Sequence, residues 1–122
     1  MNLSELVPGP PISCSPTTTA KAAARLMEAE HVGSIAVIDD DQFVGLVTDR
    51  DMVQLVGNAT DANVPVSTFM TQQPDTVDID TEVEDAADWL NATGYRHLPV
   101  TRNGKLIGMI SIKDLLWAIA GQ

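Results

Sequence analysis

Only one cysteine, Cys14, occurs in the chain, so no disulfide can form within it and a reducing compartment fits the composition. Aromatic residues make up only 4% of the 122 residues, which leaves Val, Ile, Leu, Ala and Met to build the core. A core of that kind is typical of a small α/β protein with β-branched strands and alanine-rich helices. A chain of this length is expected to form a single module.

Basic residues are scarce as well: 7 Lys and Arg stand against 17 Asp and Glu, a net charge of −10. This balance argues against binding to nucleic acid or to an anionic membrane, because both need a basic surface. It leaves room for a small anion site at a helix N-terminus. The first residues lack the pattern of a signal peptide, and no apolar run approaches the roughly 18 residues of a membrane-spanning helix. We therefore expect a soluble cytoplasmic protein with no nucleic-acid or membrane partner.

A seven-residue pattern occurs twice, at residues 45–51 (Gly-Leu-Val-Thr-Asp-Arg-Asp) and at residues 108–114 (Gly-Met-Ile-Ser-Ile-Lys-Asp). The apolar pair is typical of the end of a strand. The hydroxyl residue, with an Asp three positions later, is typical of the first turn of a helix. The same 63-residue offset aligns, without a gap, Ser4 with Ser67, Pro11 with Pro74 and Val37 with Val100. The chain is therefore predicted to be two copies of one supersecondary unit.

Each copy is predicted to have the order strand, helix, strand, strand, helix. Asn103-Gly104 between two apolar runs is a strong hairpin signal. Short helical turns are expected at residues 3–7 and 64–70. The strands are expected at residues 12–15, 34–38 and 43–47 in the first copy, and at residues 76–79, 97–101 and 106–110 in the second.

The helices are predicted from their caps and their apolar spacing. The first helix is expected to be capped by Thr17 or Thr18 in the first copy and by Thr81 in the second. In the second copy Gly94 is expected to end it, where the first copy has His31. The second helix should follow the hydroxyl residue of the seven-residue pattern. It should run from Thr48 into Met52, Val53 and Val56, and from Ser111 into Leu115, Leu116 and Ile119. These boundaries divide the chain into a first repeat at residues 8–57, a linker at 58–73 and a second repeat at 74–120.

Laid out in this way, the chain resembles a tandem pair of cystathionine β-synthase (CBS) domains over nearly its whole length. The order of elements and both seven-residue patterns carry the resemblance, as do Tyr-Arg-His-Leu-Pro-Val at residues 95–100 and Val-Ser-Thr-Phe-Met-Thr at residues 66–71. It implies an α/β (α+β) fold of two βαββα repeats, packed through their sheets with pseudo-two-fold symmetry and often dimeric. Such pairs usually bind AMP, ADP, ATP or S-adenosylmethionine between the repeats and regulate another protein, which here would be a separate chain.

The resemblance also implies roles for individual residues. Asp51 and Asp114 would accept hydrogen bonds from the ribose hydroxyls, as a short carboxylate can do with both oxygens. The phosphate groups would be held at the helix starts and by nearby basic groups: Thr48, Ser111, Arg50, Lys113, Arg96 and His97. The nucleobase would be enclosed by residues of the leading and second strands: Ser13, Cys14, Ser34, Ala36, Thr76, Val77, Leu98 and Pro99.

Capping is a structural alternative for the repeated pattern. Thr48 with Asp51, and Ser111 with Asp114, have the spacing of capping boxes. Capping alone would explain the hydroxyl and part of the preference for the carboxylate, and a hydroxyl can serve both roles.

Three further features also have structural alternatives. Arg96 and His97 would suit an exposed strand start, and because their counterparts are Gly33 and Ser34 the two sites cannot be equivalent. Cys14 is more readily explained as a small buried residue than as a reactive thiol. The three consecutive aspartates at residues 39–41 lack the alternating spacing, the Gly and the final Glu of a calcium loop, so no metal is expected.

Two functions of different classes stay open. One is a regulatory module that binds an adenosine-containing ligand and modulates a partner. The other is a ligand-independent structural or dimerisation protein, whose contact surface would involve Trp89, Leu115, Leu116 and Trp117. An enzyme with a catalytic cofactor is not expected, because the sequence has no Ser-His-Asp order, zinc spacing, P-loop or paired catalytic carboxylates.

Overall fold

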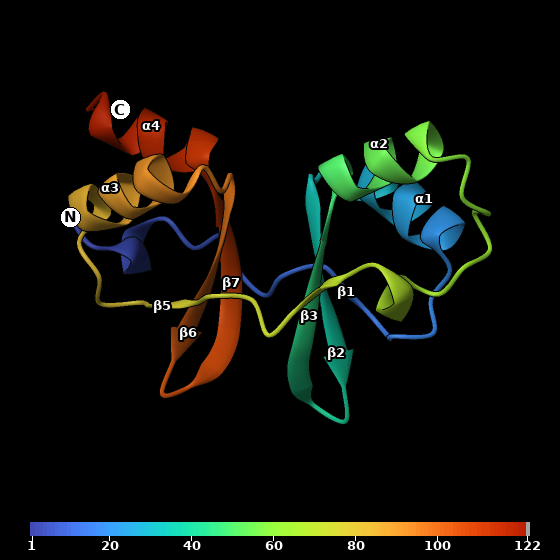
Figure 1. Cartoon of the computed structure of the whole chain (residues 1–122). Helices are drawn as coiled ribbons and strands as arrows, with labels where there is room; N and C mark the ends of the chain where they lie inside the picture. The colour runs from blue at the N-terminus through green and yellow to red at the C-terminus, as the bar shows by residue number, and fades with distance from the viewer. Residues whose placement is uncertain (122) are drawn as a thin grey trace. The chain divides into compact units, whose positions relative to one another are not determined.

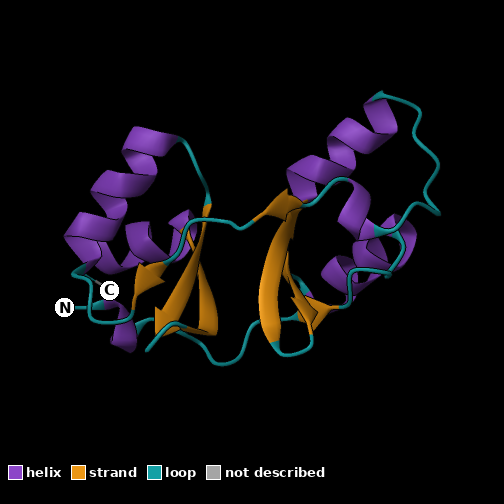
Figure 2. Ribbon diagram, turned by 60° about the horizontal axis from the view of Figure 1, so that its bottom comes forward, coloured by secondary structure: helices purple, strands orange, loops and turns teal. Residues whose placement is uncertain are grey.

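The structure, a computed structural model, describes residues 1–121, and these fall into two compact units. The first-repeat unit is Ile12–Pro74. The second-repeat unit combines Met1–Pro11 with the chain from Asp75 onward. In each unit the helices gather on one face of a small sheet (Figures 1 and 2). Of the helices among residues 1–121, none is long and apolar enough to cross a membrane.

The first-repeat unit has a four-stranded sheet in the order β1-β2-β3-β4. β1 (Ser13–Cys14) is parallel to β2 (Ser34–Asp39), whereas β3 (Gln42–Thr48) is antiparallel to both β2 and β4 (Thr71–Gln72). Helix α1 (Ala20–Glu30) connects β1 to β2, and helix α2 (Asp49–Gly57) follows β3. A turn of 3-10 helix, η2 (Val66–Thr68), precedes β4.

The second-repeat unit repeats this plan with three strands in the order β5-β6-β7. β5 (Val77–Asp78) is parallel to β6 (His97–Arg102), which forms a hairpin with β7 (Lys105–Ser111). Helices α3 (Val83–Thr93) and α4 (Ile112–Ile119) cover it, and η1 (Leu3–Glu5) comes from the start of the chain. The order strand, helix, strand, strand, helix in both units confirms the predicted α/β class.

Each unit has its own core, formed where the helices meet alternate residues of the strands. In the first-repeat unit Ile35, Val37 and Val47 of the sheet pack with Ala23 and Met27 of α1. In the second-repeat unit the equivalent sheet residues are Leu98, Val100 and Ile110, which pack with Ala86 and Leu90 of α3. The 63-residue offset therefore extends from the sequence to the cores.

The caps of the first helices differ from the prediction. Thr19, rather than Thr17 or Thr18, caps α1, its hydroxyl accepting from the Ala22 amide at 3.1 Å. Helix α3 has Glu82 at the cap position with no side-chain cap, and Thr81 lies one residue before it. Backbone bonds from distant parts of the chain hold both helix starts: the Ala20 amide donates to the Val64 carbonyl at 2.9 Å, and the Val83 amide donates to the Met1 carbonyl at 3.0 Å. The carbonyls of Thr18 and Thr81, just before these starts, accept backbone bonds as well.

Those carbonyls bind two equivalent segments, residues 3–7 and 66–70, which we call the leader segments. The Val66 amide donates to the Thr18 oxygen at 2.8 Å, and 63 residues away the Leu3 amide donates to the Thr81 oxygen at 3.0 Å. The helical turn that precedes each repeat in the sequence thus packs into the unit of the other repeat. Leu3 and Val66 are both fully buried there.

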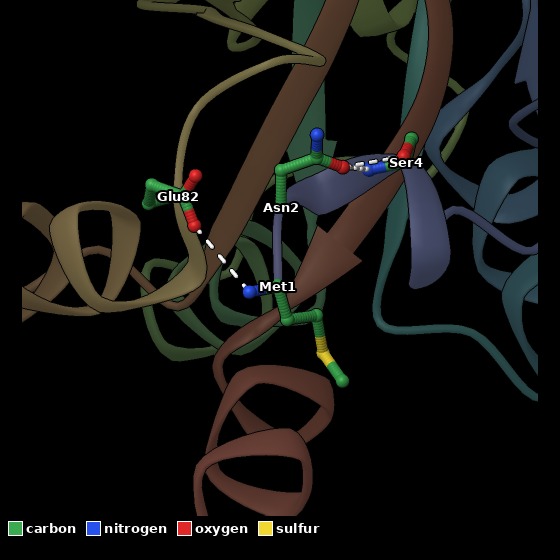
Figure 3. A network of polar contacts seen from close by, with 4 residues as sticks. All are labelled: Met1, Asn2, Ser4 and Glu82. Carbon is green, nitrogen blue, oxygen red and sulfur yellow. Dashed lines mark hydrogen bonds and ion pairs between the residues drawn. The ribbon is translucent and has the colours of Figure 1, made fainter.

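The first leader segment is also anchored by polar contacts (Figure 3). The Asn2 carboxamide caps η1 by accepting from the Ser4 amide at 3.0 Å and from the Ser4 hydroxyl. The Met1 amino group lies 3.4 Å from a Glu82 carboxylate oxygen. Both ends of that ion pair are exposed, so it adds little stability, and the buried Leu3 side chain is the main anchor.

The apolar residues of the second helices divide between the cores and the surface. Met52 and Leu115, which are 63 residues apart, face the cores. Four other apolar residues of these helices are at least half exposed: Val53, Val56, Leu116 and Ile119. The inward positions one turn further on are taken by Leu55 and Ala118, because a three-residue step from Met52 or Leu115 stays on the same side of a helix.

Candidate functional site

Both seven-residue patterns form complete capping boxes at the start of a helix. The Asp51 carboxylate accepts from the Thr48 amide at 2.8 Å, and the Thr48 hydroxyl accepts from the Asp51 amide at 3.4 Å. The Ser111 and Asp114 pair makes the same two bonds at 3.0 and 3.2 Å. The structural alternative for these residues is therefore confirmed, and each of the four side chains has a role without a ligand.

The helix starts are held by a second backbone bond as well. The Asp49 amide donates to the Gly33 carbonyl at 3.0 Å, and the Ile112 amide donates to the Arg96 carbonyl at 2.8 Å. Together with the capping bonds, this occupies the first and third amides of each helix. At most one of the first three amides, that of Arg50 or Lys113, is left for an anion. Charge for a phosphate would consequently come from side chains more than from backbone amides.

The capping bonds use only part of the hydrogen-bond acceptor capacity of the Asp51 and Asp114 carboxylates. Each uses one oxygen in its box, whereas an ionised carboxylate offers about four acceptor positions. Asp51 is half-buried and Asp114 is exposed. Both carboxylates are thus pre-oriented by the helix start and keep acceptor capacity for a donor from outside the chain, such as a pair of hydroxyl groups.

The two motif sites differ in the residue that lies opposite the capping hydroxyl. In the first-repeat unit Ser34 pairs with Thr48 across β2 and β3, and Ser34 is only 6% exposed. In the second-repeat unit half-buried His97 takes that place opposite Ser111. Arg96, just before β6, is exposed. The second site therefore combines an imidazole and a guanidinium where the first has a hydroxyl and a glycine.

The residues expected around a nucleobase divide between the two faces of the sheets. Side chains alternate along a strand, so Ser34 and Ala36 lie on the face opposite the core residues Ile35 and Val37. Ser13 pairs with Ala36 in the neighbouring strand. Three of the expected residues instead pack in or against the cores on the helix side: Cys14, Val77 and Leu98.

The second-repeat unit shows the same division. Pro99 is buried and alternates with the core residues Leu98 and Val100, so it lies on the opposite face with His97. Thr76 is exposed and precedes β5. Within each unit, the structure brings the polar motif residues and one face of the sheet together, while the core-facing residues are separated from them by the strand.

Cys14 is half-buried and packs against the first core. Burial raises the pKa of its thiol above the ordinary value, and a hydrogen bond with Thr18 offsets part of that rise. A thiol in this setting stays protonated at neutral pH and is a poor nucleophile. The interpretation of Cys14 as a small buried residue fits these observations.

The glycine that opens each seven-residue pattern makes room for a leader segment. A Cβ on Gly45 would overlap the Met70 side chain, and a Cβ on Gly108 would overlap Val7 and lie 3.2 Å from the Gly9 carbonyl oxygen. These glycines therefore serve packing within each unit. Sequence reasoning missed Val7 and Met70, although they are 63 residues apart and the repeat offset already related them.

The fold and the paired motifs define a two-repeat α/β module, and comparison with known proteins identifies its family. The CBS domain family matches residues 3–58 and again residues 66–121. The chain belongs to the CBS domain family and carries two copies of the domain.

Individual relatives agree with this assignment. A 17.7 kDa protein of Acidianus ambivalens is 42% identical over 106 residues, which are 85% of this chain and 64% of that protein. A protein of Methanopyrus kandleri is 34% identical over 109 residues, 86% of this chain and 56% of its own length. The chain thus spans about three-fifths of the length of these curated relatives.

Solved structures of CBS proteins superpose closely. The CBS-domain protein ATU1752 of Agrobacterium tumefaciens has a TM-score of 0.92 at 26% identity and covers 98% of this chain and 99% of that one. PAE2072 of Pyrobaculum aerophilum, a complex with AMP, has a TM-score of 0.88 at 28% identity, with both chains fully covered. CBSX2, also a complex with AMP, has a TM-score of 0.85 at 29% identity, covering 98% of this chain and 96% of that one.

Proposed function

We propose that this chain is a regulatory CBS pair that binds an adenosine-containing ligand and thereby alters the activity of a separate partner protein. The candidate ligands are AMP, ADP, ATP and S-adenosylmethionine. The observation that carries the proposal is the pair of carboxylates, Asp51 and Asp114, which the capping boxes orient while leaving acceptor positions unused. That two structures 28% and 29% identical to this chain are complexes with AMP supports the choice of ligand class.

Asp51 and Asp114 would accept hydrogen bonds from the ribose hydroxyls, because two adjacent hydroxyls match the two oxygens of one carboxylate. Thr48 and Ser111 would contribute their hydroxyls next to it. The base would contact the sheet face opposite the core, where Ser34 and Ala36 lie in the first-repeat unit.

The phosphate groups would be bound mainly by the second-repeat unit. Lys113 follows its capping serine, Arg96 precedes β6, and His97 lies opposite Ser111. The first-repeat unit has only Arg50 in an equivalent place, with Gly33 and Ser34 as the counterparts of the other two. In a chain of net charge −10, this local group of basic residues is the more favourable place for a phosphate.

The proposal is tested by calorimetric titration with AMP, ATP, adenosine and S-adenosylmethionine. At least one is expected to bind at micromolar to millimolar concentration, and Asp114→Asn should weaken binding more than Asp51→Asn if the second-repeat unit dominates. Asn is chosen because its carbonyl oxygen can still accept the capping bond, so the helix start is kept while the charge is lost. No binding by any of the four at millimolar concentration would remove the proposal.

Regulation requires that ligand binding favour one arrangement of the protein over another, since a ligand shifts an equilibrium only through differential affinity. Trp89 and Trp117 both lie in the second-repeat unit, so tryptophan fluorescence reports on that unit. A change of emission on ligand addition, lost in Asp114→Asn, would support a response there.

A second candidate function is dimerisation through the outer faces of the second helices, and a specific observation favours it. Val53 and Val56 are 71% and 78% exposed, and their counterparts Leu116 and Ile119 are 59% and 50% exposed. Trp117, which follows Leu116 on α4, is 62% exposed. Large exposed apolar side chains grouped on a helix are typical of contact surfaces.

This surface differs from the one expected from sequence. Leu115 is fully buried and Trp89 packs against the core and against Tyr95, whose ring centroid is 5.5 Å away. Only Leu116 and Trp117 of the expected set are available. Sedimentation of the wild type and of Leu116→Lys tests the idea: a dimer is expected for the first and a shift to monomer for the second, with or without nucleotide.

A further inference from the structure

The two hairpin tips have the same backbone but different residues. Asn103 and Gly104 join β6 to β7 with φ of 52° and 79°. Asp40 and Asp41 join β2 to β3 with φ of 47° and 62°. Positive φ at both central positions is the type I′ turn, which favours Asn-Gly and Asp-Gly. All four residues are exposed.

Asn103 is followed by Gly104, which has no side chain to shield the Gly104 backbone nitrogen. A Cβ placed on Gly104 would meet no atom of residues 1–121 within 4 Å, so this part of the turn is open. We propose that Asn103 is a deamidation site, whose aspartate product the hairpin accepts and whose isoaspartate product it does not.

The reaction needs only water. The Gly104 nitrogen attacks Cγ of Asn103, a five-membered succinimide ring closes, and the side-chain nitrogen leaves as ammonia. Water then opens the ring at one of its two carbonyls. One opening gives aspartate with the original backbone, and the other gives isoaspartate, in which the backbone passes through the side-chain carboxyl carbon.

The repeat shows that aspartate fits this position. Asp40, the counterpart of Asn103, already adopts the same left-handed conformation. Charge favours the product too: Arg102 and Lys105 pair directly across the hairpin, and like charges in that arrangement are unfavourable. A carboxylate at residue 103 would follow Arg102 directly in the chain and precede Lys105 by two residues. Isoaspartate would lengthen the chain by one backbone atom and disturb the two-residue turn and its register.

The site is remote from the proposed ligand residues. β7 runs from Lys105 to Ser111, a rise of about 20 Å at roughly 3.3 Å per residue. Figure 1 shows the β6–β7 turn at the opposite end of the hairpin from α3 and α4. Conversion to aspartate would therefore add a negative charge at the tip without touching Asp114.

The test is incubation of the folded full-length protein in warm, mildly alkaline buffer, followed by peptide mass spectrometry and labelling with an isoaspartyl methyltransferase. Asn103 is expected to convert several-fold faster than each of the other asparagines: Asn2, Asn58, Asn63 and Asn91. Gly104→Asp, which copies Asp41, should fold and slow the conversion several-fold. Equal rates at all five asparagines would overturn the assignment of the site.

Asn103→Asp tests the second half separately. It should give the circular dichroism spectrum of the wild type and melt at the same or a higher temperature, and lowering the salt should widen the difference because the gain is electrostatic. A lower melting temperature for Asn103→Asp would overturn the claim that the hairpin accepts the product.

Discussion

Replacing Leu3 by Ala should destabilise the second repeat and leave the first nearly unchanged, although Leu3 precedes the first repeat in the sequence. Leu3 is fully buried in the second core, where it packs in one cluster with Ile79 and Leu90. Its amide bond to the Thr81 carbonyl involves only backbone and survives the substitution. The change therefore isolates the packing of one side chain.

The expected cost is about 3 kcal/mol, which combines lost apolar burial with the cavity left behind. Amides of α3 and α4 that exchange by opening of this unit should then exchange about a hundredfold faster, since about 1.4 kcal/mol corresponds to a tenfold change. Amides of α1 and α2 should keep their rates. Val66→Ala is the matched control, because Val66 lies 63 residues on and is fully buried in the first core. It should cost about 2 kcal/mol and accelerate exchange in α1 and α2 instead.

Hydrogen–deuterium exchange followed by peptide mass spectrometry separates the four helices. Urea unfolding followed by tryptophan fluorescence gives a second reading, because Trp89 and Trp117 both report on the second-repeat unit. If Leu3→Ala accelerated exchange in α1 and α2 as much as in α3 and α4, the assignment of the leader segments to opposite units would be refuted.

Three further predictions follow from single contacts. Gly108→Ala should lower the melting temperature, because the added Cβ would overlap Val7 of the leader segment. Gly57→Ala is the control and should not lower it, because the space around Gly57 is open. Equal melting temperatures for the two variants would contradict the packing role of Gly108. His31→Gly should stabilise the protein by about 1 kcal/mol. Residue 31 ends α1 in the left-handed conformation, with a φ of 56°, and this conformation costs a residue with a Cβ about 1 kcal/mol relative to glycine. Urea denaturation measures the change, and a loss of stability would contradict the prediction. Burial raises the pKa of the Cys14 thiol above its usual 9.0. The stability linked to this thiol is therefore fully present below pH 9.0 and is lost as the pH rises past the folded-state pKa. Iodoacetamide should label the folded protein at neutral pH more slowly than the urea-unfolded chain, and equal labelling rates would argue against burial.

Much of the fold follows from local signals that occur twice. Strand and helix boundaries came out close to prediction because alternation and capping act over a few residues. The paired hairpins, the N-cap of α2 at Thr48 and the N-cap of α4 at Ser111 are of this kind. The failures are also informative. Thr17 or Thr18, and Thr81, were expected to cap helices, but the cap positions fall on Thr19 and Glu82. The first helical amides, those of Ala20 and Val83, donate to the carbonyls of Val64 and Met1, and no local pattern shows a bond between residues that distant.

The candidate site was predicted in part. Their spacing was enough to single out Thr48, Asp51, Ser111 and Asp114. Of the two interpretations, capping and ligand contact, the structure shows the capping boxes. Alternation along the strands places the residues expected to contact the base on two opposite faces of the sheets. The sequence did not show which face the helices would cover, so it could not show which of these residues would be buried in the cores. The ligand roles of these residues stay predictions, and the titrations above address them.

That the chain is two copies of one unit can be read from the sequence alone, because the 63-residue register is visible without any structure. The sequence also shows where strands give way to helices, since a hydroxyl and a carboxylate three residues apart suffice to start one. The folded structure was needed to see that each leader segment completes the core of the other repeat and that Gly45 and Gly108 leave room for its side chains. The reason is physical: capping and alternation are satisfied within one turn or one strand, whereas burial of Leu3 or Val66 depends on surfaces that come together only when distant parts of the chain meet.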